Sequence, residues 1–234
     1  VGQPLDVAPT FRWPRGRVEG ETRWRGTIVV ETPLLVPKGA TLELRPGTVV
    51  AFAPGVGVEV LGKIIAGGPT GEPVRFTSRD DAGPGAWGEI HLERAQGAAF
   101  TRCVFEHAEW GLHAHFTDLA VTECVFRRNK GGMRFRSGPV RVLSSDFVEN
   151  EIGLRAFRGH AEITGSLITR NRIGVFVREK GGGLTIHGND IHDNSSYNVR
   201  LGDFNDEDVD ARGNWWGVGD PQDGIFDAAE EPGI

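Results

Sequence analysis

The chain has 234 residues, of which 34 are glycine, and its formal net charge at pH 7 is −6. This acidic balance argues against general binding to nucleic acid, and no run of residues approaches the ~18 apolar positions that a membrane-spanning helix needs. The high glycine content favours many tight corners and little helix.

Residues 1–26 contain three prolines and two tryptophans but show no hydrophobic periodicity. A segment of this kind, placed before a run of repeats, is suited to cover the open end of a stacked core. We therefore expect an N-terminal cap over residues 1–26. Because the first residue is Val1 and not Met, we also expect a mature, extracytoplasmic chain from which a signal peptide has been removed.

From Thr27 onwards, apolar and polar residues alternate as in β-strands, with glycine and proline between the alternating runs. The run beginning at Val58 echoes the run that begins shortly before it at Leu42, which predicts shorter coils here than later in the chain. Phe76 aligns with Phe105, but the two are separated by more than one repeat. The alignment therefore predicts an inserted corner loop around residues 79–85.

A short motif recurs between residues 98 and 216. Its third position is occupied by Phe105, Phe126, Phe147, Ile168, Ile191 and Trp216, at steps of 21, 21, 21, 23 and 25 along the chain. Each repeat contains three pairs of apolar residues at i and i+2, which predicts three short strands per turn. The pattern therefore predicts an all-β fold, a right-handed parallel β-helix of roughly eight coils over residues 27–217. Residues 218–234 would form a C-terminal cap or tail.

Two columns of the repeat are expected inside the coil. Asn129, Asn150, Asn171 and Asn194 fall at one corner, where stacked amides can hydrogen-bond from coil to coil and satisfy corner carbonyls. Cys103 and Cys124 share an inward column one coil apart, within the Cα separation that a disulfide allows. We favour free buried thiols, and a disulfide stays the alternative.

The outward positions of the third strand carry an unusual stripe of basic and aromatic residues. We predict that it binds ligand through His91, His113, His115, Arg134, Arg136, Arg155, Phe157, Phe176, Arg178 and Arg200. Stacked like charges repel, whereas arginine binds carboxylate or sulfate groups and aromatic faces stack on sugar rings. The stripe thus favours a groove for an anionic polysaccharide. The alternative is a solvated face neutralised by Glu109, Glu149 and Glu151.

The acidic run of residues 203–210 is a separate candidate, in which the oxygen ligands suitable for Ca²⁺ would be Asp203, Asn205, Asp206 and Asp208. The spacing matches no known calcium loop, so we favour a solvated acidic loop and expect no cofactor. No other metal-ligand spacing stands out.

The chain resembles bacterial secreted right-handed β-helix proteins of the pectate-lyase-like superfamily over most of residues 27–234. The resemblance rests on the repeat and on the segments 44–52 (LRPGTVVAF), 73–78 (PVRFTS) and 213–217 (GNWWG). It implies the fold more than the chemistry, because the superfamily includes lyases, hydrolases, epimerases and proteins of no assigned activity. Its lyases use Ca²⁺-binding aspartates with an arginine or lysine base, and its pectin-type hydrolases use a pair of aspartates.

This chain offers only fragments of those catalytic patterns. The weak candidates are Asp80, Asp81, His187, Asp190 and His192. We therefore predict a monomeric, non-catalytic module that binds an anionic polysaccharide or another cell-surface partner, with neither nucleic acid nor a membrane span. A polysaccharide-active enzyme and a structural spacer of a larger surface protein are the alternatives.

Overall fold

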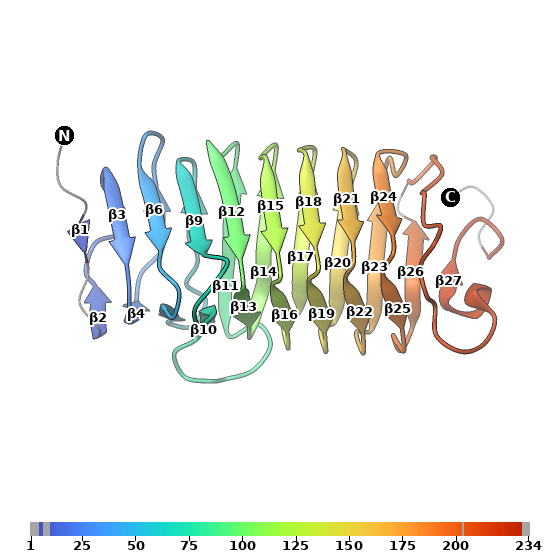
Figure 1. Ribbon diagram of the computed structural model, residues 1–234, viewed down its shortest axis with the longest axis horizontal. Coiled ribbons are helices and arrows are strands. Elements are labelled where there is room, and N and C mark those ends of the chain that lie inside the picture. Colours follow the sequence, from blue (N-terminus) through green and yellow to red (C-terminus); the bar gives the residue numbers. More distant parts are fainter. Residues whose placement is uncertain (1–4, 7–9, 203, 231–234) are drawn as a thin grey trace.

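The computed structural model describes residues 5–6, 10–202 and 204–230. In these residues the chain winds through three parallel sheets of nine strands each, which run side by side along the molecule (Figure 1). The predicted parallel β-helix is confirmed, with about one coil more than expected. Within the described residues no helix is long and apolar enough to cross a membrane.

The three sheets take the strands of each coil in turn. Sheet A consists of β1 (Leu5–Asp6), β3 (Glu21–Trp24), β6 (Thr41–Leu44), β9 (Lys63–Gly67), β12 (Gly97–Thr101), β15 (Leu119–Thr122), β18 (Val140–Leu143), β21 (Ala161–Thr164) and β24 (Leu184–His187). Sheet B consists of β2 (Thr10–Trp13), β4 (Thr27–Val30), β7 (Val49–Phe52), β10 (Val74–Ser78), β13 (Cys103–Glu106), β16 (Val125–Arg127), β19 (Asp146–Val148), β22 (Leu167–Thr169) and β25 (Asp190–His192). Sheet C consists of β5 (Leu34–Val36), β8 (Val58–Val60), β11 (Trp87–Glu93), β14 (Ala108–His115), β17 (Gly131–Arg136), β20 (Ile152–Phe157), β23 (Ile173–Arg178), β26 (Tyr197–Gly202) and β27 (Ile225–Phe226).

The sheets extend into both terminal segments. In the segment 1–26, β2 pairs with β4 and β3 pairs with β6, and Trp13 packs on Trp24 with ring centroids 5.2 Å apart. In the segment 218–234, a short 3-10 helix η1 (Pro221–Gly224) leads into β27, which pairs with β26. Both segments therefore add strands to the solenoid.

The coils over residues 34–66 are no shorter than the later ones. Thr41 pairs with Lys63 and Leu34 with Val58, so each of these coils slightly exceeds the step from Phe105 to Phe126. The expectation of shorter coils was wrong, because the two echoing runs lie in different sheets, Leu42 in sheet A and Val58 in sheet C. Strands of different sheets have the same alternation and similar corners, so the pattern alone does not distinguish them.

The inserted loop lies where the alignment predicted it. Phe76 pairs with Phe105 in sheet B, and the long connection from Ser78 to Trp87 projects from one corner (Figure 1). The insertion lengthens this coil, and the strand that follows it, β11, pairs with β14 with one irregularity of register between Glu89 and Ile90.

A column of stacked rings fills the centre of the solenoid. Phe76, Phe105, Phe126 and Phe147 follow one another with centroids 4.8, 4.6 and 4.7 Å apart, and the rings are nearly parallel. All four are buried, as are Ile168 and Ile191, which continue the column. Parallel strands place the same side chain at the same point of every coil, so one aromatic position in the repeat creates the whole stack.

The predicted asparagine ladder is confirmed. Asn129 Nδ2 donates to Asn150 Oδ1 at 3.0 Å, Asn150 Nδ2 to Asn171 Oδ1 at 3.0 Å, and Asn171 Nδ2 to Asn194 Oδ1 at 2.9 Å. The same amides donate to corner carbonyls such as that of Phe126. Burial of these amides therefore leaves few unsatisfied polar groups at the corner.

A second ladder, which the sequence analysis missed, begins at the two cysteines. Cys124 Sγ, Ser145 Oγ, Ser166 Oγ, Asn189 Oδ1 and Asn214 Oδ1 each accept a hydrogen bond from the backbone N–H one coil earlier. Both cysteines are buried free thiols. The column therefore uses sulfur, hydroxyl and amide groups for the same task, because each can accept one hydrogen bond.

Replacing Phe126 by alanine removes a ring that is stacked on both sides. We expect a loss of about 3–5 kcal/mol in the free energy of unfolding, from lost burial and the cavity left behind. Urea denaturation followed by circular dichroism measures this loss. Val125→Ala, at the adjacent outward position, is the matched control, and equal midpoints for the two variants would contradict the register.

Replacing Asn150 by alanine leaves the N–H of Asn129 and the carbonyl of Phe126 without their partner. We expect a loss of about 2–4 kcal/mol in unfolding free energy, because each unpaired buried polar group costs roughly 1–3 kcal/mol. Glu151→Ala, at the exposed neighbouring position, should stay within about 0.5 kcal/mol of the parent. Equal stability of both variants in urea would show that the ladder contributes nothing.

Candidate functional site

The outer face of sheet C carries two columns of polar and aromatic side chains, in the predicted register. The first column contains Glu59, His91, His113, Arg134, Arg155, Phe176, Arg200 and Phe226. The second contains Glu93, His115, Arg136, Phe157, Arg178 and Gly202. All ten residues predicted to bind ligand therefore lie on one face, and their role stays a prediction.

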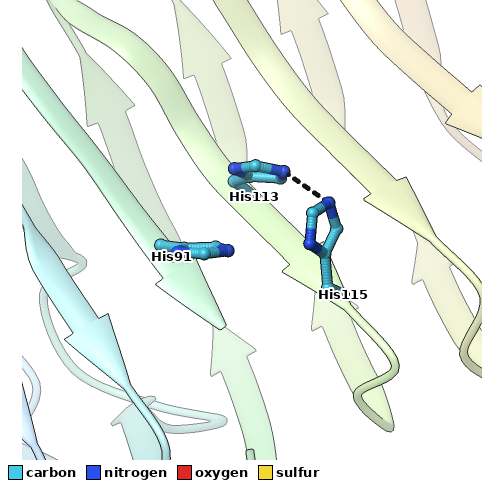
Figure 2. Close-up of side chains that lie close together, drawn as sticks. All are labelled: His91, His113 and His115. Carbon is cyan, nitrogen blue, oxygen red and sulfur yellow. Dashed lines mark hydrogen bonds between the residues drawn. The ribbon is translucent and has the colours of Figure 1, made fainter. Parts of the chain in front are cut away.

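His91, His113 and His115 form a compact group on β11 and β14, here named the histidine cluster. The rings of His91 and His113 stack with centroids 4.5 Å apart, and the ring of His115 lies edge-on to both (Figure 2). Nε2 of His113 and Nε2 of His115 are 2.9 Å apart. One candidate ligand atom from each ring lies within 4.8 Å of the others, so the cluster has the composition of a metal site.

Two glutamates orient the rings of the histidine cluster. Glu89 Oε1 lies 2.8 Å from Nδ1 of His113, and Glu93 Oε2 lies 3.1 Å from Nδ1 of His115. The other oxygen of each carboxylate accepts from an arginine, Arg134 for Glu89 at 2.9 Å and Arg94 for Glu93 at 2.5 Å. Each carboxylate is therefore fixed between an imidazole and a guanidinium.

Burial and these contacts act in opposite directions on the ionisable groups. Burial by itself raises the pKa of Glu89, but the hydrogen bonds and charges of His113 and Arg134 outweigh it, and the pKa lies below the usual value of 4.5. Burial is the largest effect on His113 and lowers its pKa below 6.5, against the opposing effect of Glu89. At neutral pH, Glu89 is ionised and the His113 ring is neutral.

The C-terminal half of the same face alternates guanidinium groups with aromatic rings. The four arginines Arg134, Arg155, Arg178 and Arg200 are here named the arginine ladder. Arg134 lies over Trp110, Arg155 and Arg178 over Phe157 and Phe176, and Arg200 over Phe176 and Phe226, at 4.8 to 6.0 Å from the ring centroids. These cation–π contacts hold stacked like charges in place.

The rings are covered to different extents. Phe176 is only 6 % exposed beneath the guanidinium groups, whereas Phe157 is half-buried. Stacking on a sugar, which the sequence suggested for both rings, is therefore open to Phe157 but blocked at Phe176. The guanidinium groups form the outer surface here.

The carboxylates considered as neutralising partners of the stripe pair elsewhere. Glu109 pairs with Lys130, Glu149 with Arg128 and Arg170, and Glu151 with Arg172. Among the residues that the structure describes, no carboxylate lies within ion-pair distance of Arg200, whereas Arg134 pairs with Glu89 and Arg136 with Glu179. Within the ladder, Arg134 thus shares its charge with Glu89.

A hollow of about 490 Å³ lies beside the histidine cluster on the N-terminal half of the face. Its lining includes Leu35, Glu59, Glu89 and His91. The hollow therefore shares two residues with the histidine cluster and its glutamates.

On sheet B, a buried carboxylate went unnoticed in the sequence. The side chain of Glu106 is 4 % exposed and binds both Arg75 and Arg127, the latter at 2.8 and 3.0 Å. Burial raises the pKa of Glu106, but the two arginines outweigh it and the pKa is lowered from 4.5. The register would have revealed the pairing, since Glu106 and Arg127 are one coil apart and lie opposite each other on β13 and β16.

The catalytic candidates near the C-terminal end lie on two sheets. His187 ends β24 in sheet A and faces Glu162 at 3.4 Å, whereas His192 ends β25 in sheet B and contacts Asp193 at 2.8 Å. Asp190 is exposed at the start of β25. No hydrogen bond or ion pair joins these three candidates within the described part of the chain.

The two aspartates of the inserted loop also have separate partners. Asp80 accepts two hydrogen bonds from Arg79, each 2.9 Å long. Asp81 Oδ1 lies 3.1 Å from Nδ1 of the buried His107. The two neighbouring aspartates therefore have different partners, Arg79 for Asp80 and His107 for Asp81.

The calcium candidates form no cluster of ligands among the described residues. Asp206 is bound by Lys180 at 2.7 and 2.9 Å, and Asn205 donates to the backbone of Glu207. Asp203 lies outside the described residues. These contacts favour the interpretation of the segment as a loop with its own ion pairs.

The histidine cluster shows what the sequence analysis missed. His91 and His113 are one coil apart, and His115 follows on the same side of the same strand as His113. These residues were interpreted as part of a polysaccharide groove, and metal binding was considered only at the acidic run. The spacing of one coil and of i, i+2 was the available signal.

Comparison with known proteins gives one match. The family model described as the right-handed β-helix region matches residues 85–215, which contain the histidine cluster and the arginine ladder. No curated protein and no solved structure matches the chain significantly.

Glu106→Gln tests the buried triad. Because the pKa of Glu106 is lowered on folding, its ionised form stabilises the protein above pH 4.5, and this contribution is lost as the pH falls through the lowered pKa. We expect the variant to lose about 2 kcal/mol of unfolding free energy at pH 7 and less at pH 3. Urea titrations across pH measure the difference, with Glu123→Gln as the exposed control. A loss that does not change with pH would refute the electrostatic assignment.

Proposed function

Because the chain belongs to the family of right-handed β-helix proteins, we propose that it is a non-catalytic, extracytoplasmic module that binds an anionic polysaccharide along its arginine ladder. The polymer would lie parallel to the solenoid axis on the outer face of sheet C. The observation that carries the proposal is the regular series of guanidinium groups, each of which lies over an aromatic ring at about 5 Å from its centroid.

The stacking supports anion binding through its geometry. A cation–π contact uses the flat face of a guanidinium, whereas carboxylate and sulfate groups bind its N–H edge in the plane of the group. Arg155 and Arg200 share a column two coils apart, a separation of ~10 Å along the axis. A polymer with regularly repeated acidic groups can contact several such edges at once.

The covered rings favour a polysaccharide over a nucleic acid. Proteins that bind single-stranded nucleic acid usually offer exposed aromatic rings on which bases stack. Here Phe176 lies under Arg155 and Arg200, and only Phe157 offers part of its ring. With a net charge of −6, the chain also lacks the general basic character of nucleic-acid-binding proteins.

The carboxylates beside the ladder support a binding role over catalysis. A glycosidase needs two carboxylates that converge on the scissile bond. Glu89 and Glu93 lie on this face, and both are held by a histidine and an arginine. A ladder of arginines with its carboxylates already engaged is suited to hold a polymer.

Gel retardation in polygalacturonate, alginate and heparin tests the proposal. We expect retardation of the parent protein that weakens with salt, because the contacts are ionic. The double variant Arg155→Gln/Arg200→Gln should bind at least about tenfold more weakly, since a hydrogen bond to a charged group contributes roughly 1.5–3 kcal/mol.

The matched control is Arg128→Gln/Arg141→Gln, which removes the same charge from a corner and from sheet A. Equal loss in both double variants would show that only total charge matters, and absence of retardation on every polymer would leave the spacer interpretation. Release of unsaturated products or new reducing ends would identify the protein as an enzyme.

A further inference from the structure

The contacts of His113 and His115 fix where their hydrogens lie. Nδ1 of each ring faces an oxygen of Glu89 or Glu93, at 2.8 and 3.1 Å. A carboxylate accepts hydrogen bonds, so Nδ1 of each ring is placed as the donor, and Nε2 of each ring is left as the available ligand atom. The two Nε2 atoms lie 2.9 Å apart, close enough to share one cation.

The third ring indicates which cation fits. Nε2 of His91 is buried and has no hydrogen-bond partner in the structure, although it lies 3.8 Å from Glu93 Oε2. The His91 ring stacks on His113, with its outer nitrogen on the side of His115 (Figure 2). A proton can join only two nitrogens, whereas a metal ion accepts three or more ligands.

We propose that the histidine cluster binds one divalent transition-metal ion of the zinc, nickel and copper group through a ring nitrogen of His91, His113 and His115. Imidazole suits these ions, whereas Ca²⁺ requires oxygen ligands. None of its three ligands belongs to the arginine ladder, and Arg134 of the ladder contacts the site through Glu89.

The distances between the ligand nitrogens need only a small adjustment to bind one ion. With bonds of ~2.1 Å, two nitrogens at 2.9 Å subtend an angle of about 90° at the ion, and a tetrahedral angle would need ~3.4 Å. The ligand atoms now lie within 4.8 Å of one another. The His91 side chain is 29 % exposed, so a rotation of its ring can close the largest gap.

Glu89 and Glu93 complete the site from outside. A metal-binding histidine typically donates its other N–H to a carboxylate, which fixes the ring and makes the bound nitrogen more basic. His113 and His115 both have such a partner, and the negative charges of the two carboxylates balance the two positive charges of the ion. Arg134 and Arg94 hold the second oxygens, which keeps these carboxylates in place as positioning groups.

Three protein ligands leave the ion with an open position. His91 and His115 are 29 % and 31 % exposed, and the hollow lined by Leu35, Glu59, Glu89 and His91 lies beside them. A bound ion can therefore take a water molecule or a small anionic or nitrogen ligand from this side, in contrast to closed structural sites with four protein ligands.

The test uses untagged protein that has been freed of metal by dialysis against a chelator. Calorimetric titration with ZnCl₂ should show binding of one ion per chain at micromolar or lower concentration, and CaCl₂ should give no such signal. CoCl₂ should produce visible absorption bands, which ZnCl₂ then abolishes by displacement.

Three variants test two of the ligands and one of the positioning carboxylates. His113→Gln and His115→Gln should each weaken Zn²⁺ binding at least about 100-fold, and Glu93→Gln should weaken it roughly 10- to 100-fold. The controls are His160→Gln and His187→Gln, which lie outside the cluster and should bind Zn²⁺ like the parent. Circular dichroism and urea midpoints, measured in the presence of chelator, establish that each variant is folded. If the His113 variant is unfolded, the variant of the more exposed His115 tests the site in its place.

Two results would overturn the proposal. One is absence of Zn²⁺, Ni²⁺ and Cu²⁺ binding to the parent protein, which would leave a proton shared by His113 and His115. The other is undiminished binding in both histidine variants. Arg155→Gln/Arg200→Gln should bind Zn²⁺ normally, so failure of the polysaccharide proposal and failure of the metal proposal are distinguishable.

Discussion

The hydrogen-bonded stacking of coils at their corners is the constraint on which the rest of this molecule depends. Arg128, Glu149, Arg170 and Asp193 adopt positive φ, and an asparagine of the ladder follows each of them. A left-handed conformation costs a non-glycine residue roughly 1–2 kcal/mol, and the amide that follows offsets this cost by satisfying backbone groups of two coils. Because the corner recurs once in every coil of this region, each coil lies in register on the one before.

Register turns a one-dimensional repeat into columns, and the columns give the outer face of sheet C its character. The same column changes from Glu59 through His91 and His113 to Arg134 and Arg200 along the axis. Strand spacing of ~4.8 Å brings imidazoles into contact at one place and guanidinium groups at another. A flat sheet can thus present two chemically distinct regions without any loop built for the purpose.

The arginines of this face contact neighbouring carboxylates and aromatic rings. Arg134 contacts both Glu89 and Trp110, and so belongs to the carboxylates of the histidine cluster on one side and to the arginine ladder on the other. Farther along, Phe176 lies between Arg155 and Arg200 in the same column and contacts both guanidinium groups. Arg134 is thus held by an ion pair and a cation–π contact, and Arg200 has cation–π contacts with Phe176 and Phe226.

The sequence by itself determined the parallel β-helix, the inward and outward columns and the asparagine ladder, because a regular period and the i, i+2 alternation are properties that can be read along one dimension. It could not determine which early strands stack, since Leu42 and Val58 lie in different sheets but have the same pattern. Nor could it show that Glu89 and Glu93 fix the tautomers of His113 and His115, or that Phe176 is covered by arginines. Those facts depend on side-chain rotamers and on contacts across coils, which only the tertiary structure decides.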